Sequence, residues 1–249
     1  NGALWRQVTE NQGTSIVNSS VAIGDINPSS YNNHIPDAVI GADIVQNLWS
    51  FAGDEWHDYS GDQTPYNLSP GWIQIGTSNS TVGGHYVDCS PVIGQLDGTG
   101  PYDVAVGDQD GGLLVRLSSD TDWRRYQITG TGETHPAIQS SPIIVNLDGQ
   151  PCLVFGCDNG KVYAIHADAN GTPASGWSGG ILLNPDDATG TPHAIKASPL
   201  YGNVVSNTTD PQVIVASTDG IVYALWKNGT NHSGGAIAQK WICTQSDTV

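Results

Sequence analysis

Three histidines stand at equivalent places in the chain, each five residues before a serine. They are His85 in HYVDCS, His135 in HPAIQS and His193 in HAIKAS. Neutral imidazole is a good ligand for zinc, copper, iron and manganese. If the three segments converge in the fold, they predict a transition-metal site. The alternative is that each histidine was copied with a repeat and hydrogen-bonds the turn ahead of a strand, and the corresponding position of the first copy is Ser15.

A second group of candidate residues lies in the long insertion from Trp49 to Trp72. It combines aromatic rings with acids, as in DEWHDYSGD. A flat ring covers the apolar face of a sugar while a carboxylate accepts hydrogen bonds from its hydroxyls. The insertion therefore predicts a glycan-binding surface formed by Trp49, Trp56, Tyr59 and Tyr66. The alternative is a hydrophobic lid over the first repeat, or a contact surface for a neighbouring subunit.

Motifs of common enzyme classes are missing from the sequence. It contains no GxSxG elbow, no HExxH, no phosphate-binding loop and no dinucleotide fingerprint. Acid pairs such as Asp120 and Asp122 fall in expected loops, where solvated turn residues are the usual explanation. We therefore expect no enzymatic activity and no required cofactor. The alternative is a metal-dependent polysaccharide lyase, or another carbohydrate-active enzyme, that uses His85, His135 and His193.

Features of a secreted protein accompany these groups. Seven Asn-x-Ser/Thr sequons predict N-glycosylation in loops or at strand ends. They begin at Asn18, Asn67, Asn79, Asn170, Asn207, Asn228 and Asn231. The four cysteines contain no CxxC pair, which argues against structural zinc. They leave two disulfides, in any of three pairings, or buried free thiols as alternatives. We expect an extracellular or cell-surface location.

The charge of the chain limits its partners. It carries 24 acidic and 8 basic residues, for a net charge of −16. Binding a polyphosphate requires lysine and arginine to displace its counterions, so nucleic acid and anionic membrane surfaces are excluded. No apolar run is long enough to cross a bilayer. Cations, neutral sugars and other proteins remain, or the acidic residues only keep the chain soluble.

Internal repetition indicates which elements must position these residues. SSVAIGD at 19–25 returns as CSPVIGQ at 89–95, SSPIIVN at 140–146 and ASPLYGN at 197–203. Three copies run on into VGDQDGGLLVRL, FGCDNGKVYAI and VASTDGIVYAL. The central Asp-Gly or Asn-Gly pair between apolar runs predicts a hairpin with a two-residue type I′ turn. A period of 50 to 70 residues suits one four-stranded sheet.

These repeats predict an all-β fold, a β-propeller built from four recognisable four-stranded blades within one domain, 1–249. The blades are expected at about 13–77, 84–129, 135–183 and 193–245. Residues 1–12 form an extra outer strand. The fourth strand of each blade is placed at Trp72, Trp123, Trp177 and Trp241, and Trp5 marks the extra strand. The propeller either closes with four blades or is a section of a larger one, whose unpaired edges would favour association.

The repeats resemble the FG-GAP/VCBS and quinoprotein-like (PQQ-type) β-propeller repeats of cell-surface proteins. In these families an SSPxxxDLDGDG segment leads to a VVGxxDGxVYAL hairpin. The similarity is carried by SPVIGQLDGTGPYDVAVG at 90–107 and DNGKVYAIHADANGTPASGW at 158–177. It covers nearly the whole chain except 51–70. It implies the fold, whereas such propellers serve lyases, dehydrogenases, lectins and adhesins alike.

The resemblance also implies a calcium loop between the first two strands of a blade. In the second copy this loop retains Asp97 and Asp103 as its carboxylates, fewer than the family pattern has. Calcium takes six to eight oxygen ligands. The alternative is that these acids cap their own turns. Together these features predict a structural or adhesive module of a surface assembly or filament. Its expected partners are copies of itself, other surface proteins or glycans.

Overall fold

The chain is described here by a computed structural model. It describes residues 20–24, 37–42, 47–51, 87–120, 123–129, 135–183, 192–206, 208–229 and 236–242, and for 37–42 and 47–51 it describes the backbone alone. All regular structure in these ranges is β-strand, which confirms the all-β prediction. No helix within the described ranges has the length and apolar character needed to cross a membrane.

The strands form four sheets, which we call units 1 to 4 in chain order. Unit 1 has three described strands, β1 (Ala22–Gly24), β2 (Asp37–Ala42) and β3 (Asn47–Phe51). Unit 2 contains β4 (Val92–Gly94), β5 (Asp103–Gly107), β6 (Gly112–Arg116) and β7 (Arg124–Gln127). Unit 3 contains β8 (Ile143–Asn146), β9 (Pro151–Gly156), β10 (Lys161–Ile165) and β11 (Ile181–Leu182). Unit 4 contains β12 (Leu200–Gly202), β13 (Gln212–Ala216), β14 (Ile221–Trp226) and β15 (Ile237–Ile242).

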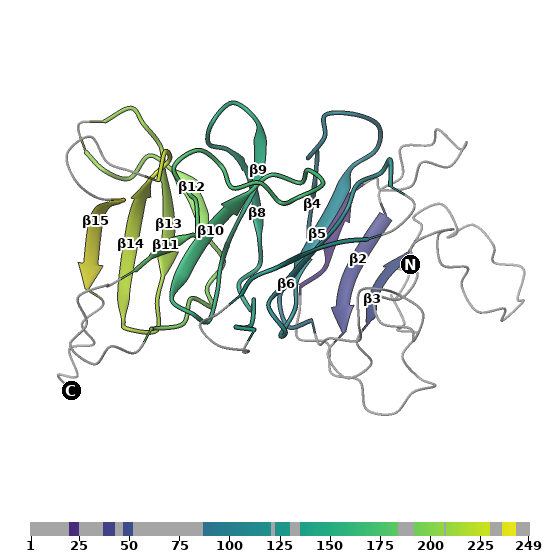
Figure 1. Ribbon diagram of the computed structural model, residues 1–249, viewed down its shortest axis with the longest axis horizontal. Coiled ribbons are helices and arrows are strands. Elements are labelled where there is room, and N and C mark those ends of the chain that lie inside the picture. Colours follow the sequence, from purple (N-terminus) through teal and green to yellow (C-terminus); the bar gives the residue numbers. More distant parts are fainter. Residues whose placement is uncertain are drawn as a thin grey trace, which may run out of the picture.

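Each unit is an antiparallel meander in which strands pair in chain order. The first strands of units 1, 2 and 3 lie next to one another. The units stand in a row, with unit 1 at one end and unit 4 at the other (Figure 1). The described strands thus include three of the four-stranded sheets that the sequence predicts. They do not form a closed ring of four.

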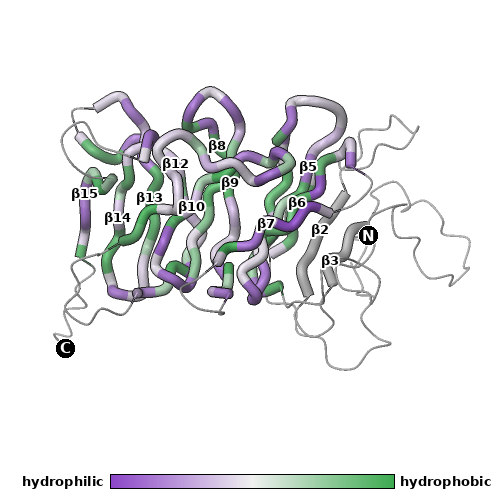
Figure 2. Tube along the Cα trace, viewed as in Figure 1, coloured by the Kyte–Doolittle hydropathy of each residue, from purple (hydrophilic) through white to green (hydrophobic). Residues whose placement is uncertain are grey.

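The cores lie between adjacent sheets. On β9, Leu153 and Phe155 pack toward unit 2, and Cys152 and Val154 pack toward unit 4. Side chains alternate between the two faces of a strand, so a strand covered on both faces must be apolar at every position. The middle strands are accordingly hydrophobic along their length, while the connecting loops are hydrophilic (Figure 2).

The hairpins between the second and third strands of units 2 to 4 are present, but the predicted two-residue turn is wrong. In unit 3 the N–H of Cys157 bonds the carbonyl of Lys161 at 3.0 Å, so three residues form the loop. The third of them, Gly160, has a positive φ of 75°. A type I turn followed by one left-handed residue is the usual form of such a three-residue loop.

The tryptophans predicted to mark the fourth strands occupy different kinds of position. Trp241 lies within β15, and Trp123 directly precedes β7. Trp177 lies in the loop before β11, so its assignment to a strand is wrong. Its buried indole instead bonds unit 4, because Nε1 donates to the carbonyl oxygen of Lys227 at 2.9 Å. Trp5 and Trp72 lie outside the described residues.

Candidate functional site

The serines that open each repeat join neighbouring units. The backbone N–H of Ser20 donates to Oγ of Ser90 at 2.8 Å, and the N–H of Ser90 donates to Oγ of Ser141 at 2.8 Å. At the third junction the preceding serine, Ser140, donates from Oγ to the carbonyl oxygen of Ala197 at 3.0 Å. The repeated serine therefore has a physical role, because each unit fixes the next through one hydrogen bond near its first strand.

Glycines beside these serines leave room for the next unit. A Cβ added at Gly24 would lie 2.4 Å from Cγ2 of Ile93, and one at Gly94 would lie 2.8 Å from Cδ1 of Ile144. Real Cβ atoms do not approach so closely, so the isoleucine of one unit occupies the space that a side chain would need in the unit before it. We call each such glycine a socket and each such isoleucine a knob.

A second set of sockets lies on the second strands. Cβ atoms added at Gly107 and Gly156 would each lie 2.3 Å from the side chain of the residue that fills the socket, Ile138 and Ile195 respectively. The backbone of each of these isoleucines also donates to the preceding unit. The Ile138 N–H bonds the carbonyl of Asp108 at 2.9 Å, and the Ile195 N–H bonds that of Cys157 at 3.1 Å. The segments between units thus lie against the hairpins at equivalent positions.

The outer strand of unit 2 makes polar contacts to unit 3. Arg124 donates from Nη1 to the carbonyl oxygen of Ala167 at 2.6 Å, and the hydroxyl of Tyr126 donates to the carbonyl of Asp168. Burial raises the pKa of the Tyr126 phenol, although the neighbouring Arg124 lowers it. The phenol therefore stays a neutral donor over the physiological range.

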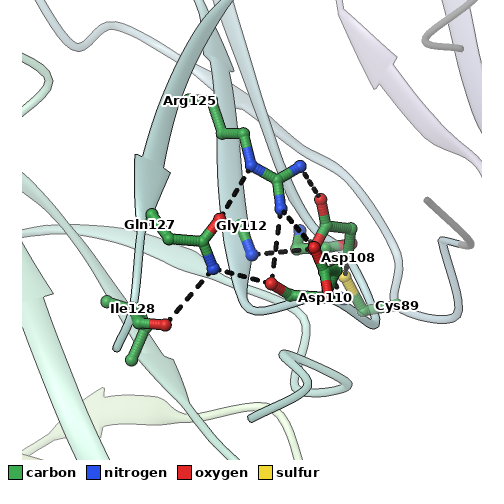
Figure 3. A network of polar contacts seen from close by, with 8 residues as sticks. Cys89, Asp108, Asp110, Gly112, Arg125, Gln127 and Ile128 are labelled. Carbon is green, nitrogen blue, oxygen red and sulfur yellow. Dashed lines mark hydrogen bonds and ion pairs between the residues drawn. The ribbon is translucent and has the colours of Figure 1, made fainter. Parts of the chain in front are cut away.

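A network of polar contacts lies at the hairpin end of unit 2 (Figure 3). Oδ1 of the fully buried Asp108 accepts the N–H groups of Asp110 and Gly112, at 2.9 and 2.7 Å. Its Oδ2 accepts a hydrogen bond from Nη1 of Arg125, with which it also forms an ion pair, at 2.5 Å. Gln127 bonds Arg125 Nε through its side-chain oxygen at 3.0 Å and the carbonyl of Asp110 through its nitrogen at 2.6 Å. The acid is thus saturated by internal donors, which suits it to holding the hairpin and leaves it little capacity for a ligand.

The predicted histidine site is only partly within the described residues. His135 is exposed and His193 is half-buried, and each begins the segment that lies along the hairpin of the preceding unit. His85 lies outside the described residues. Across the described ranges, no three His, Cys, Asp or Glu side chains gather closely enough to hold a metal ion. The three-histidine site stays a prediction that depends on His85.

The predicted calcium residues form a turn. Asp103 is buried, and its two carboxylate oxygens accept the N–H groups of Leu96 and Ser118, at 2.6 and 2.8 Å. Burial raises the pKa of Asp103, and these two hydrogen bonds lower it. Asp97 is exposed and accepts the N–H of Thr99 at 2.8 Å. This is the turn-capping geometry that was the alternative, and calcium binding at Asp97 and Asp103 stays a prediction.

One polar cluster was not found from the sequence. Oδ2 of Asp148 lies 3.2 Å from Nε2 of His166 and accepts the N–H of Ser175 at 2.8 Å, while Nδ1 of His166 lies 3.0 Å from the carbonyl oxygen of Pro151. Burial raises the pKa of Asp148, but the hydrogen bonds from Ser175 and His166 outweigh it and the net pKa is lowered. The cluster ties two loops of unit 3 together. Asp148 recurs as Asp97 in unit 2, but His166 has Leu117 at the equivalent position there, so the repeat pattern gave no signal for the pair.

Three cysteines are buried free thiols, one of the two alternatives left open by the sequence. Cys152 and Cys157 belong to different core layers, and Cys89 lies in a third. Burial raises the pKa of Cys89 and of Cys152 to about 12 and that of Cys157 to about 11. These thiols are therefore poor nucleophiles. Cys243 lies outside the described residues.

The remaining predicted sites fall largely outside the described residues. Trp49 is within β3, of which only the backbone is described, and Trp56, Tyr59 and Tyr66 lie outside the described residues. Five of the seven sequons also lie outside them, at Asn18, Asn67, Asn79, Asn207 and Asn231. Asn170 and Asn228 are exposed, as a glycosylation acceptor must be. Glycan binding and glycosylation stay predictions.

Exposed apolar side chains concentrate at the two ends of the row. Among the described residues, six of the eight most exposed large apolar side chains belong to units 1 and 4: Val21, Ile23, Leu200, Val204, Trp241 and Ile242. Ile23 is 68% exposed, Leu200 67% and Ile242 71%. Concentrated apolar surface marks a site of contact with another molecule. The sheet faces at the ends of the row are thus the strongest candidate site on the described chain.

Comparison with known proteins supports the fold. No protein-family model and no curated protein matches the chain. The C-terminal domain of Pseudomonas aeruginosa PilY1, a propeller-like structure, is similar at 15% identity, with a TM-score of 0.54 over 84% of this chain and 50% of that one. BBS1N, crystallised in complex with ARL6DN, has a TM-score of 0.46 at 14% identity over 92% of this chain and 55% of that one. The chain thus spans about half the length of these structures.

Proposed function

We propose that this chain is a β-propeller section that acts as a structural or adhesive contact module outside the cell, binding proteins or glycans. The observation that carries the proposal is the exposed apolar surface of units 1 and 4. In the interior, the same kinds of residue are covered by the next sheet. Sheets that keep apolar side chains exposed are suited to holding another molecule.

The surface chemistry supports a contact role of this kind. A net charge of −16 excludes nucleic acid as the partner and keeps the chain soluble despite its apolar ends. The exposed positions of Asn170 and Asn228 are compatible with glycosylation in a secretory pathway. The resemblance of the repeats to FG-GAP/VCBS and PQQ-type surface propellers supports the same proposed location. We propose that the chain forms part of a larger propeller or filament, since units 1 and 4 lie at opposite ends of the row.

The proposal can be tested by adhesion of protein-coated beads. Beads carrying the purified chain are expected to attach to each other, or to a panel of immobilised neutral oligosaccharides. Variants Leu200→Asp and Trp241→Asp remove apolar area at one end and should weaken attachment between beads. Tyr102→Asp, at an exposed apolar side chain of unit 2, is the matched control and should attach normally. Beads that neither attach to each other nor retain any glycan would contradict the proposal.

A further inference from the structure

The last unit of the row carries an empty socket. Gly202 occupies in unit 4 the position that Gly24 and Gly94 occupy in units 1 and 2, three residues after a Pro or Val that follows the repeated serine. At Gly24 and Gly94 the next unit's isoleucine fills the space, whereas a Cβ added at Gly202 would meet no atom of the described residues within 4 Å. Gly202 therefore retains the space of a socket with no knob in it.

The first unit carries the complementary unused knob. Ile23 aligns with Ile93 and Ile144, which fill the sockets at Gly24 and Gly94. Those two isoleucines are partly buried in the core layers, while Ile23 is mostly exposed. The row of described units thus carries a socket on one side and a knob on the other.

The serine hydrogen bonds at the internal junctions run in the same direction as the sockets and knobs, from one unit to the next. In units 1 and 2 the serine N–H donates to Oγ of the serine one unit later. Ser198, the aligned serine of unit 4, is exposed, and so is Ser20 of unit 1. If a unit 1 lay on unit 4, the Ser198 N–H would face Oγ of Ser20. In that arrangement unit 4 would supply both the socket and the N–H donor, and unit 1 of the second copy would supply both the knob and the Oγ acceptor.

The outward face of unit 4 is apolar over much of its width. Val213 and Tyr223 pack toward unit 3, so their neighbours in the sequence face the other way. These include Ile214 and Val222, and Val222 pairs with Trp241 on the adjacent strand. With Leu200, which pairs with Ile214, they form an apolar surface that lies at the end of the row. The corresponding faces of units 2 and 3 are the ones that receive the next unit.

We propose that unit 4 of one molecule receives unit 1 of a second copy, through the contact that joins successive units within the chain. This inference rests on the proposed contact function and names its partner. The second copy is the occupant that the chain itself specifies, because the contact continues an established interface and both halves are present. The interface is head-to-tail, so each added copy presents a fresh socket and the assembly grows as a filament or closes as a larger ring.

Two single variants each remove one half of the contact. Gly202→Val fills the socket, and Ile23→Asp replaces the knob by a charge. Both positions are open in the single chain, so both variants should keep the melting temperature of the unmodified protein. Gly94→Val is the matched control for the glycine substitution, since its side chain would clash with Ile144 and the melting temperature should fall.

Sedimentation velocity then distinguishes the possible modes of association. The unmodified chain is expected to form larger species as its concentration rises, and each variant alone should stay monomeric. Ile23→Asp keeps its socket and Gly202→Val keeps its knob, so an equimolar mixture should form a dimer and nothing larger. A monomeric unmodified chain, assembly that both variants retain, or a mixture that stays monomeric would overturn the inference. If that monomeric chain still binds glycan on beads, the inference of self-assembly fails while the proposed contact function stands.

A disulfide test separates assembly from closure within one chain. At the internal junction, the Cβ position of Gly24 lies 3.3 Å from Cβ of Ile93, close to the roughly 3.5 to 4.5 Å of a disulfide. Ile23→Cys with Gly202→Cys, in a Cys243→Ser background, should therefore link separate chains into a ladder on a non-reducing gel under mild oxidation. A link within single chains, seen as a faster-migrating monomer, would show closure into a ring and overturn the inference.

Discussion

Replacing Asp108 by alanine should destabilise the protein strongly, because it removes the buried acceptor that holds the hairpin of unit 2. The carboxylate is fully buried and accepts hydrogen bonds from two backbone N–H groups and from both Nη1 and Nη2 of Arg125, whose side chain is itself only 16% exposed. Removing one member of a buried ion pair costs about 3 to 5 kcal/mol, because the other charge is left without a partner. Since Arg125 retains some contact with water, we expect a loss of about 3 kcal/mol in the free energy of unfolding.

For a chain of this size, about 1 kcal/mol lowers the melting temperature by roughly 2 to 4 °C. The Asp108→Ala variant should therefore unfold about 6 to 12 °C below the unmodified protein in thermal unfolding followed by circular dichroism. Asp110→Ala is the matched control, since its carboxylate lies 3.6 Å from Arg125 and is exposed, and it should cost less than about 1 kcal/mol. The double variant Asp108→Ala with Arg125→Ala should lose less than the sum of the two single variants. An Asp108→Ala protein that melts with the unmodified one would refute this account of the hairpin.

Three further predictions concern burial, charge and packing. In a Cys243→Ser background, native protein should resist iodoacetamide at pH 8 and become reactive in urea, because burial raises the thiol pKa of the other three cysteines, Cys89, Cys152 and Cys157. The unfolded thiols ionise first, so the free energy of unfolding should fall as the pH rises above about 9, and a flat profile in urea titrations would contradict the assignment. The pKa of Asp148 is lowered in the folded protein, so its carboxylate stabilises the fold above the acid's unfolded pKa of about 3.9. Between pH 6 and pH 3 the melting temperature of Asp148→Asn should therefore drop less than that of the unmodified chain. Equal drops would contradict a stabilising role of Asp148. Gly107→Ala should lower the free energy of unfolding by about 1 to 3 kcal/mol in chemical denaturation, because the added Cβ would lie 2.3 Å from Ile138. Gly202→Ala should leave that free energy unchanged. Equal effects of the two variants would contradict the packing described for the sockets.

The strands of units 2 to 4 could be predicted because their sequence carries local information. Apolar runs on either side of an Asp-Gly or Asn-Gly pair indicate a hairpin wherever they occur. The length of the turn could not be predicted, because a side chain decides it. In unit 2 the carboxylate of Asp108 accepts the N–H of Gly112, and in unit 4 that of Asp219 accepts the N–H of Ile221, so the loop is stabilised by contacts that a two-residue pattern does not contain.

The tryptophan assignments failed at Trp177 for a related reason. The repeated tryptophan does not mark one kind of position: Trp177 is buried in a loop of unit 3, whereas Trp241 is exposed on strand β15 of unit 4. The junctions between units were also hidden in the sequence. The repeated serine and glycine were visible, but their partners lie 51 to 70 residues away along the chain, so only the stacked sheets reveal what they bind.

The most direct test of contact through the ends of the row is hydroxyl-radical footprinting of dilute and concentrated protein. Side chains buried by a partner lose reactivity, whereas those on free surface retain it. We expect protection at Ile23, Leu200 and Trp241 in the concentrated sample, while the exposed control residues Tyr102 and Leu182, in units 2 and 3, stay equally reactive. Protection at the control residues instead, or reactivity at the ends that does not change with concentration, would contradict the account.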